Sequence, residues 1–210
     1  MKIKPNFTVS FGDYYMIKFP SGELQVTYLC NVNNYRLGGI SITGSVTCSD
    51  HIMELLQLVD AIRYVAPDAK LKLTMPYCAF SRQDRICNIG EAFSLKVFAR
   101  LINSCEFQSV ITHDNHSDVA TGLIDNCYNR SAEEVLANYS IDLELLSPTR
   151  ALKSNYDFFI SPDAGANKKV FGCSKKFDVP MLRADKTRDT TTGSITSTDI
   201  YVNEGQLDNT

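Results

Sequence analysis

Apolar and polar residues alternate along several short stretches of the chain, with the two-residue period that is typical of β-strands. The alternation, together with one short apolar run, predicts strands over residues 14–29, 38–46, 71–77, 107–114, 156–161, 179–184 and 194–202. Apolar residues that recur every three or four positions predict helices over 49–65, 92–105, 131–137 and 165–177. Strands that alternate with helices favour an α/β fold built on a parallel sheet.

Two of these helices have candidate capping residues where they begin. Ser49 or Asp50 precedes the apolar positions of the first helix and is expected to cap it. Ser131 stands three residues before Glu134, which is the spacing of a capping box. In such a box each side chain binds the backbone N–H group of the other residue, so the helix is expected to begin there.

The length and composition are those of a folded protein with a sizeable core. The chain has 210 residues, of which 44% are apolar, so it is long enough for one large or two small domains. The segment over 138–156 is the expected boundary between two α/β units. This boundary predicts a first domain over residues 1–142 and a second over residues 143–210.

Charge and cysteine usage narrow the functional classes. The formal net charge is -3 and no run of like charges occurs, which argues against nucleic acid as the main partner. The seven cysteines are scattered without metal-ligand spacing, so we expect reduced thiols in a cytoplasmic protein. The first residues, MKIKPNFTVSFGDYY, lack the apolar run of a signal peptide, and no stretch is long enough to span a membrane.

Polar clusters follow four of the predicted strands. They are Arg82-Gln83-Asp84-Arg85, His113-Asp114-Asn115-His116, Asp163, and Asp185-Lys186-Thr187-Arg188. Ligands of parallel α/β sheets bind at the carboxyl ends of the strands, so these clusters are candidate functional residues.

Each cluster allows a functional and a purely structural interpretation. Arg82 and Arg85 are either surface ion-pair residues or donors for a phosphate, which guanidinium groups bind in a bidentate manner. The HDNHSD run is either a polar loop or a site for Mg²⁺ that keeps most of its waters. DKTRDTTTG, residues 185–193, is either a solvated loop or a mobile cationic loop over a phosphoryl group. No Walker-type phosphate-binding motif occurs in the chain.

Six segments in order along the chain resemble the ribose-phosphate pyrophosphokinase family, also called phosphoribosyl pyrophosphate synthetases. KFPSGELQV resembles the F-S-D-G-E segment of the family, and HIMELLQLVDAIR resembles its first long helix. MPYCAFSRQDR is similar to the P-Y-x-x-Y-A-R-Q-D-R motif, and ITHDNHSD to the D-L-H-A turn. FFISPDAGANKKV is similar to S-P-D-x-G-G, and RADKTRD to D-K-R-R. The resemblance implies phosphoribosyltransferase-like (Rossmann-like) units in tandem, the second one incomplete.

The resemblance also implies an activity. The family transfers a diphosphoryl group from Mg²⁺·ATP to the anomeric hydroxyl of ribose 5-phosphate and releases AMP. Matched positions imply that Arg82 and Gln83, with the neighbouring Arg85, hold ATP. His116 and Asp163 match positions associated with Mg²⁺.

Further matched positions imply the catalytic residues and a shared site. Lys186 and Arg188 match flexible-loop residues that stabilise the transferred group. Phe19 and Glu23 match residues that contact the adenine from a neighbouring subunit, which implies a homo-oligomer, a dimer or a hexamer.

The chain departs from the family pattern at four places. Ser21 replaces an aspartate near the adenine, and Thr187 removes a positive charge from the loop. Asn88 and Gly90 stand at arginine positions of a phosphate-binding loop, so regulation by ADP and phosphate is not carried over. The chain ends at YVNEGQLDNT, before the D-D-x-x-D-T-x-G-T loop that cradles the ribose phosphate, and we expect a shortened copy.

These departures leave two alternatives open. The same ATP-binding residues could serve diphosphoryl transfer to another ribosyl acceptor, such as ADP-ribose. Alternatively, the chain is a catalytically silent homologue that regulates a partner synthetase. A phosphoribosyltransferase would share the fold but would not need the SRQDR nucleotide clamp.

Overall fold

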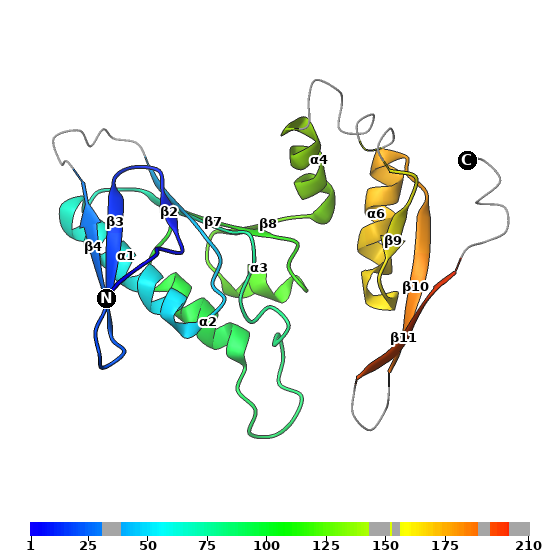
Figure 1. Cartoon of the computed structure of the whole chain (residues 1–210), viewed down its shortest axis with the longest axis horizontal. Helices are drawn as coiled ribbons and strands as arrows, with labels where there is room; N and C mark the ends of the chain where they lie inside the picture. The colour runs from blue at the N-terminus through cyan, green and yellow to red at the C-terminus, as the bar shows by residue number, and fades with distance from the viewer. Residues whose placement is uncertain (31–38, 143–151, 153–155, 189–193, 202–210) are drawn as a thin grey trace. The chain divides into compact units, whose positions relative to one another are not determined.

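The computed structural model of the chain forms two compact units, Met1–Arg130 and Ser131–Thr210. It describes residues 1–30, 39–142, 152, 156–188 and 194–201 (Figure 1). The predicted boundary, after residue 142, assigned the whole of helix α4 (Ala132–Asp142) to the first domain. In the structure that helix belongs to the second unit, where it packs against α6 (Asn167–Phe177).

A five-stranded sheet forms the centre of the first unit. Its strands, in the order β2-β5-β6-β7-β8, are Thr8–Val9, Ile40–Thr43, Leu71–Met75, Ser109–His113 and Cys127–Arg130. Strands β5 to β8 are parallel and β2 is antiparallel to β5. Leu71, Leu73 and Met75 are buried while Lys72 between them is exposed, so the sequence alternation is the alternation of two sheet faces. The predicted parallel α/β fold is confirmed in this unit.

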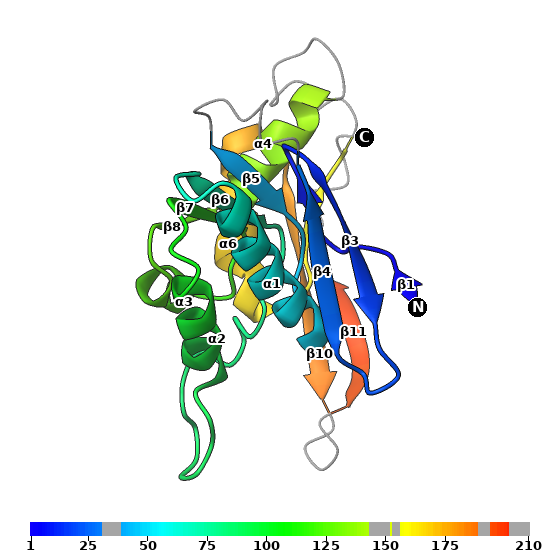
Figure 2. The ribbon, with the colours of Figure 1, turned by 90° about the vertical axis from the view of Figure 1, so that its left-hand side faces the viewer.

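Three helices cover one face of this sheet. They are α1 (Ser49–Val65), α2 (Ser94–Asn103) and α3 (Val119–Leu123). Each helix connects one parallel strand to its neighbour, and the strands follow one another in one direction across the sheet. Because such crossovers are right-handed, all three helices lie on the same face (Figures 1 and 2). Leu55, Leu58 and Ile62 of α1 are fully buried in the core beneath the sheet.

A second sheet of the first unit is antiparallel. It has the order β1-β3-β4, with strands Lys2–Ile3, Asp13–Lys18 and Leu24–Leu29. Helix α1 packs against β4, and its Gln57 side chain accepts a hydrogen bond from the N–H of Val26 and donates one to the carbonyl of Leu24. The buried carboxylate of Glu54 accepts hydrogen bonds from the N–H of Asn6 and the hydroxyl of Tyr14. Fully and partly buried polar side chains thus attach this sheet to α1.

The second unit has a smaller core. Its strands, in the order β11-β10-β9, are Ile195–Tyr201, Met181–Arg188 and Phe159–Ser161. Strand β9 is parallel to β10, whereas β11 is antiparallel to it. A short 3-10 helix η2 (Ala164–Ala166) leads from β9 into α6. The buried residues Leu152, Cys173, Phe177 and Val179 form the core.

The predicted capping box is confirmed at the start of α4. The N–H of Ser131 donates to a carboxylate oxygen of Glu134 at 2.8 Å, and the N–H of Glu134 donates to the hydroxyl of Ser131 at 3.3 Å. The prediction for α1 was wrong, because both Ser49 and Asp50 lie inside the helix and the capping position is Cys48, whose side chain makes no capping hydrogen bond. Three residues after Ser49 and Asp50 stand Ile52 and Met53, so neither position offers the reciprocal partner of a capping box.

Two predicted segments differ from the structure. The predicted strand over 14–29 is a hairpin, since the chain turns between β3 and β4 and Gly22 adopts φ +96°, a conformation that favours glycine. The prediction of a loop from residue 185 is wrong over its first four residues, because β10 continues to Arg188. Hydrogen bonding to β11 extends this polar segment as a strand, which propensity alone does not indicate. Residues 189–193 lie outside the described residues.

Candidate functional site

Connections at the carboxyl ends of three parallel strands build the candidate site of the first unit. The chain passes from β5 into α1 through residues 44–48, from β6 into α2 through residues 76–93, and from β7 into α3 through residues 114–118. Because these strands are parallel, all three connections lie at the same edge of the sheet. This edge is where the sequence placed the first two polar clusters.

One cavity at this edge gathers four of the predicted site residues. It has a volume of about 470 Å³ and is lined by Arg82, Gln83, Asp84, Arg85, Cys87, Glu91, Ala92, Ser94 and His116. A hydrogen bond of 2.6 Å from the Ser117 hydroxyl to the Asp84 carboxylate joins the connection after β6 to the connection after β7. The structure therefore brings the predicted ATP residues and the predicted metal residue His116 into one cavity.

Asp84 is a member of this cavity to which sequence reasoning gave no role. The Ser117 hydroxyl, helped by the nearby His116 and Arg85, holds the pKa of the Asp84 carboxyl below its usual value. The side chain of Arg82, in contrast, makes no ion pair with any other described residue. A guanidinium that lines an open cavity and has no counter-ion in the described part of the chain is suited to an anionic ligand.

The turn that carries Arg82 and Gln83 is fixed to helix α2. Phe80 has a left-handed backbone, φ 60°, and its ring lies 5.6 Å from the ring of Phe98 in α2. The N–H of Gln83 donates to the Phe80 carbonyl, and the Gln83 carbonyl accepts from the N–H of Leu95. The aromatic contact and these backbone hydrogen bonds position the cationic run on a rigid element.

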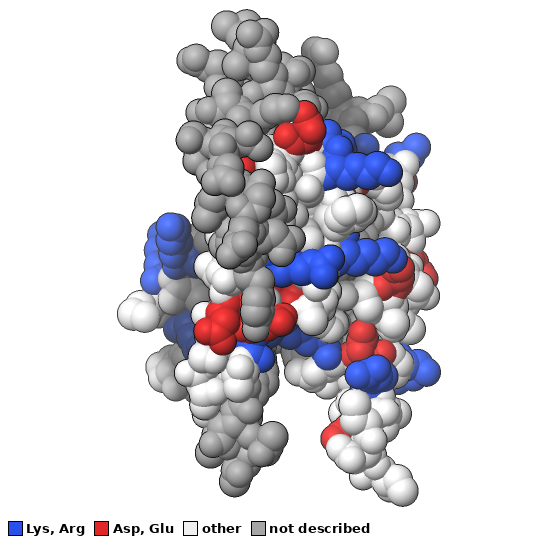
Figure 3. Space-filling model, turned by 90° about the vertical axis from the view of Figure 1, so that its right-hand side faces the viewer, with Lys and Arg blue, Asp and Glu red and all other residues white. Residues whose placement is uncertain are grey.

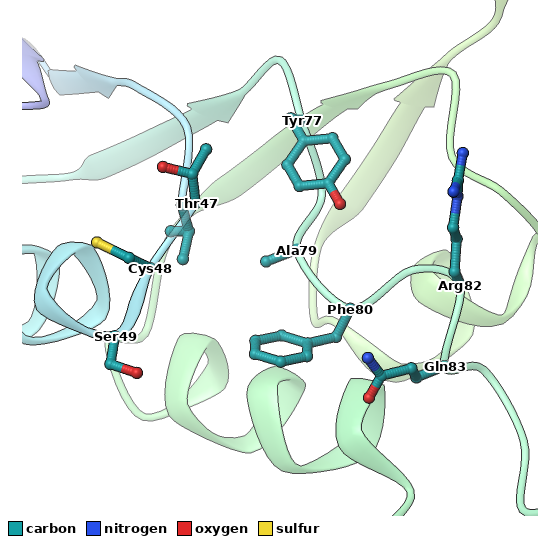
Figure 4. Close-up of a pocket in the computed structure, with 9 residues that line it drawn as sticks. Thr47, Cys48, Ser49, Tyr77, Ala79, Phe80, Arg82 and Gln83 are labelled. Carbon is teal, nitrogen blue, oxygen red and sulfur yellow. The ribbon is translucent and has the colours of Figure 1, made fainter.

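A second cavity adjoins the same turn. Its volume is about 290 Å³ and its lining is Val46, Thr47, Cys48, Ser49, Tyr77, Ala79, Phe80, Arg82 and Gln83 (Figure 4). Arg82 and Gln83 line both cavities. Sequence reasoning missed Tyr77, Phe80 and the segment 47–49. Tyr77 ends a predicted strand and the others follow the carboxyl ends of predicted strands, so the strand-end rule could have found them.

Phe19 and Glu23 line a different cavity of the first unit. This cavity, of about 520 Å³, lies between the β3–β4 turn and helix α1 and is lined by Phe19, Gly22, Glu23, Leu24, Gln25, Asp50, Met53 and Gln57. The Ser21 hydroxyl donates to the Glu23 carboxylate at 2.8 Å. Neither Arg82 nor Gln83 is part of this lining, so the structure does not bring the two groups of predicted nucleotide residues together within one chain.

The second unit brings together a predicted metal residue and a predicted catalytic residue. The Lys186 ammonium lies 2.9 Å from Oδ2 of Asp163, and the N–H of Ala166 donates to Oδ1 of the same carboxylate at 3.1 Å. The donated hydrogen bond of Lys186, followed by that of Ala166, holds the pKa of Asp163 below its usual value. Arg188 ends strand β10, and its side chain lies outside the described residues.

The donor set for a metal is small. Among the described residues, no group of three or more His, Cys, Asp or Glu side chains could hold a metal ion. Asp163 is partly exposed, so its carboxylate can supply one oxygen ligand. A single carboxylate fits a magnesium ion that takes its remaining ligands from water and phosphate, and it does not fit a dedicated protein cage.

The remaining sequence expectations concern thiols, charge and membranes. All seven cysteines are free thiols, and burial raises the pKa of Cys78 to about 12 and that of Cys105 to about 11. Figure 3 shows basic and acidic side chains interspersed over the face that it presents. No described helix is long and apolar enough to cross a membrane.

Comparisons with known proteins agree with the motifs. Residues 1–105 match the family model described as the N-terminal domain of ribose phosphate pyrophosphokinase. Ribose-phosphate pyrophosphokinase of Agrobacterium fabrum is 29% identical over 186 residues, which cover 86% of this chain and 56% of the relative. The enzyme of that name from Ralstonia nicotianae is 29% identical over 190 residues, which cover 87% of this chain and 55% of the relative. The chain spans about half the length of the curated relatives it matches.

The fold is also similar to that of a solved structure. The crystal structure of phosphoribosylpyrophosphate synthetase from Mycobacterium smegmatis aligns with a TM-score of 0.62 at 20% sequence identity. The alignment covers 91% of this chain and 59% of that protein. At this level of identity the similarity concerns the fold.

Proposed function

Because the chain belongs to the ribose-phosphate pyrophosphokinase family, we propose that it carries the ATP-binding half of a diphosphotransferase. The proposed reaction moves a diphosphoryl group from ATP to the anomeric hydroxyl of ribose 5-phosphate. A bond forms between the anomeric oxygen and the β-phosphorus, and the bond from the β-phosphorus to the α–β bridging oxygen breaks. AMP leaves with the bridging oxygen, and the hydroxyl proton is released.

The observation that supports this proposal best is the cavity shared by Arg82, Gln83, Arg85 and His116. Arg82 has no described counter-ion, so its guanidinium is available to phosphate oxygens. The Gln83 amide can donate and accept hydrogen bonds at the edge of a purine base. In the proposed complex these side chains orient ATP for in-line attack, which is the main contribution of a protein to phosphoryl transfer.

Mg²⁺ is the proposed cofactor. His116 in the first unit and Asp163 in the second are each proposed as metal-associated residues, and the nucleotide phosphates would supply further ligands. When bound, Mg²⁺ compensates the negative charge of the phosphate oxygens. Lys186 and Arg188 are proposed to stabilise the charge that develops on the transferred group. Each such preorganised donor contributes roughly 2–4 kcal/mol to lowering a barrier.

The nucleotide site is proposed to be shared between subunits of a homo-oligomer, a dimer or a hexamer. Phe19 and Glu23 line a cavity that contains neither Arg82 nor Gln83, so they would reach the same nucleotide from a second copy of the chain. A protein that sediments as a strict monomer and still binds ATP with the affinity of its relatives would contradict this arrangement.

AMP formation tests the proposed reaction. The complete gene product is incubated with Mg²⁺·ATP and either ribose 5-phosphate or ADP-ribose, and AMP is quantified by chromatography. We expect AMP only when ribose 5-phosphate is present, and a large loss in Arg82→Ala. Arg100→Ala, which removes an exposed arginine of α2, is the matched control and should behave like the parent protein.

The other outcomes separate the alternatives. AMP formed with ADP-ribose alone would identify a different ribosyl acceptor. ATP binding without AMP from either acceptor would indicate a catalytically silent homologue. Absence of ATP binding would contradict the nucleotide role proposed for Arg82 and Gln83.

A further inference from the structure

The ion pair between Lys186 and Asp163 joins two residues that the proposed function gives separate tasks. The Lys186 Nζ atom lies 2.9 Å from Oδ2 of Asp163, within one unit of the chain. In that function Asp163 serves the metal, whereas Lys186 serves the transferred phosphoryl group. In this structure each side chain instead satisfies the charge of the other.

The strand arrangement explains why the pair forms. Strand β9 pairs with β10 only from Phe159 to Ser161, opposite Met181 to Arg183. Strand β10 then continues beyond the end of β9, beside the turn that begins at Asp163. Lys186 is therefore placed next to a carboxylate that caps the N-terminus of η2 through the N–H of Ala166.

The backbone on both sides of the pair is held in place. Lys186 is paired with Thr198 of β11 in the antiparallel ladder, and Asp163 is held by the N–H of Ala166. The pair can consequently break by rotation of the Lys186 side chain, without loss of backbone hydrogen bonds. The side chains of Lys186 and Asp163 are 25% and 41% exposed, so solvent weakens their attraction and the contact is readily reversible.

Both carboxylate oxygens of Asp163 already have a donor in the structure. Lys186 approaches Oδ2 and the Ala166 N–H approaches Oδ1. A divalent cation at Asp163 would compete with the ammonium for the carboxylate, and the two positive charges would repel each other at such a distance. A metal ion and Lys186 therefore each weaken the binding of the other to Asp163.

We propose that the Lys186–Asp163 ion pair is a resting contact that keeps the lysine from the phosphoryl site until a divalent cation occupies Asp163. The inference rests on the metal role of Asp163 in the proposed function. It adds an order of events, because the cation that compensates the phosphate charge also releases the lysine. A lysine held in this way is less available to other anions in the absence of metal.

Binding of Mn²⁺ alone tests the antagonism without any turnover. Mn²⁺ broadens the NMR signals of nearby backbone amides, so titration of the full chain reports its affinity at residues 164–166. We expect Lys186→Met to increase this affinity about three- to tenfold, because both the competing group and its repulsion are removed. Lys175→Met removes an exposed lysine at the end of α6 and is the matched control, expected to change the affinity less than twofold.

The outcomes distinguish this inference from the proposed function. Equal or weaker Mn²⁺ binding in Lys186→Met would overturn the inference and leave the metal role of Asp163 intact. If Mn²⁺ does not affect residues 164–166 in either protein, or if Asp163→Asn leaves its effect unchanged, the metal role and the inference both fail.

A second measurement uses the unsubstituted protein, so it does not depend on the folding of a variant. The rate at which an acylating reagent modifies each lysine is followed by mass spectrometry of tryptic peptides, with and without Mg²⁺. Release from Asp163 should raise the rate at Lys186 about two- to fivefold and leave the rate at Lys175 unchanged. An equal rate at Lys186 with and without Mg²⁺, under conditions in which Mn²⁺ reaches Asp163, would overturn the inference.

Discussion

The candidate sites of the two units differ in whether their positively charged side chains have a counter-ion among the described residues. In the first unit Arg82 lines two cavities and has no described counter-ion. In the second unit the ammonium of Lys186 is paired with Asp163 on the neighbouring turn. An anion can therefore bind to Arg82 without displacing a protein group, whereas Lys186 must first exchange its partner. We therefore expect the first site to bind an anion directly and the second to bind one after Lys186 leaves Asp163.

The two carboxylates of these sites show the same contrast. The pKa of Asp84 is lowered chiefly by a hydrogen bond from the neutral Ser117 hydroxyl. The pKa of Asp163 is lowered chiefly by the hydrogen bond from the charged Lys186. The main donor to Asp84 is neutral, and Arg82 remains available to a ligand.

The largest expected effect is the loss of turnover in Lys186→Ala. If Lys186 acts on the transferred group, turnover should fall about a hundred- to a thousandfold while ATP affinity stays within about threefold. Steady-state AMP formation and calorimetric ATP binding measure the two quantities on an active gene product. Weaker ATP binding with unchanged turnover at saturation would show that Lys186 binds the ground state, which would remove the difference between the two sites.

Arg82→Ala, in contrast to Lys186→Ala, is expected to act mainly on ATP affinity. Loss of a charge-assisted hydrogen bond to phosphate should weaken ATP binding about ten- to a hundredfold. Arg82→Lys keeps the charge but not the planar pair of donors, so it should recover only part of the affinity. Calorimetry measures these affinities, with Arg100→Ala as the control. ATP affinity that is unchanged in Arg82→Ala would place the nucleotide elsewhere.

His116→Ala tests whether the first site also contributes to binding of the metal. His116 lines the cavity with Arg82 and Gln83, and it is proposed to serve the metal of a nucleotide bound there. We expect the parent protein to bind Mg²⁺·ATP several-fold more tightly than free ATP, and the substitution to remove most of that preference. A parent protein that binds both forms equally would contradict the metal role of His116.

The smallest expected effect concerns the two carboxyl pKa values. Ser117→Ala should raise the pKa of Asp84, and Lys186→Met should raise that of Asp163, each towards the usual value of 3.8. Because folding lowers both pKa values, both carboxylates stabilise the fold above about pH 4, and this contribution is lost as the pH falls through the folded-state pKa. NMR titration of the side-chain carboxyl carbons measures the shifts.

Salt provides the matched comparison for these titrations. High ionic strength screens the attraction of Lys186 for Asp163 but affects a hydrogen bond from a neutral hydroxyl much less. The pKa of Asp163 should therefore rise more with salt than the pKa of Asp84. Equal salt sensitivity would show that the nearby His116 and Arg85 outweigh the Ser117 hydroxyl at Asp84.

Local sequence patterns indicated many of the elements and the edge at which the site lies, but not β1, β2, α3 or β8. The alternation of Leu71, Leu73 and Met75 specified a strand with one buried face, and the spacing of Ser131 and Glu134 specified the start of a helix. Such features depend on residues within a few positions of one another, so they can be predicted without a partner segment. The parallel α/β order then placed the SRQDR and HDNHSD runs at the same edge of the sheet.

Only the tertiary structure decided which polar side chains meet. Ser117 and Asp84 are 33 residues apart, and Lys186 and Asp163 are 23 residues apart. Their contacts depend on strand register and on the extension of β10 beyond β9, which come from pairing with distant segments. Sequence reasoning accordingly predicted Lys186 in a solvated or mobile loop, whereas the structure places it in a strand beside Asp163. The physical reason is that the pairing of a polar segment in a sheet is fixed by its neighbours in space and not by its own propensity.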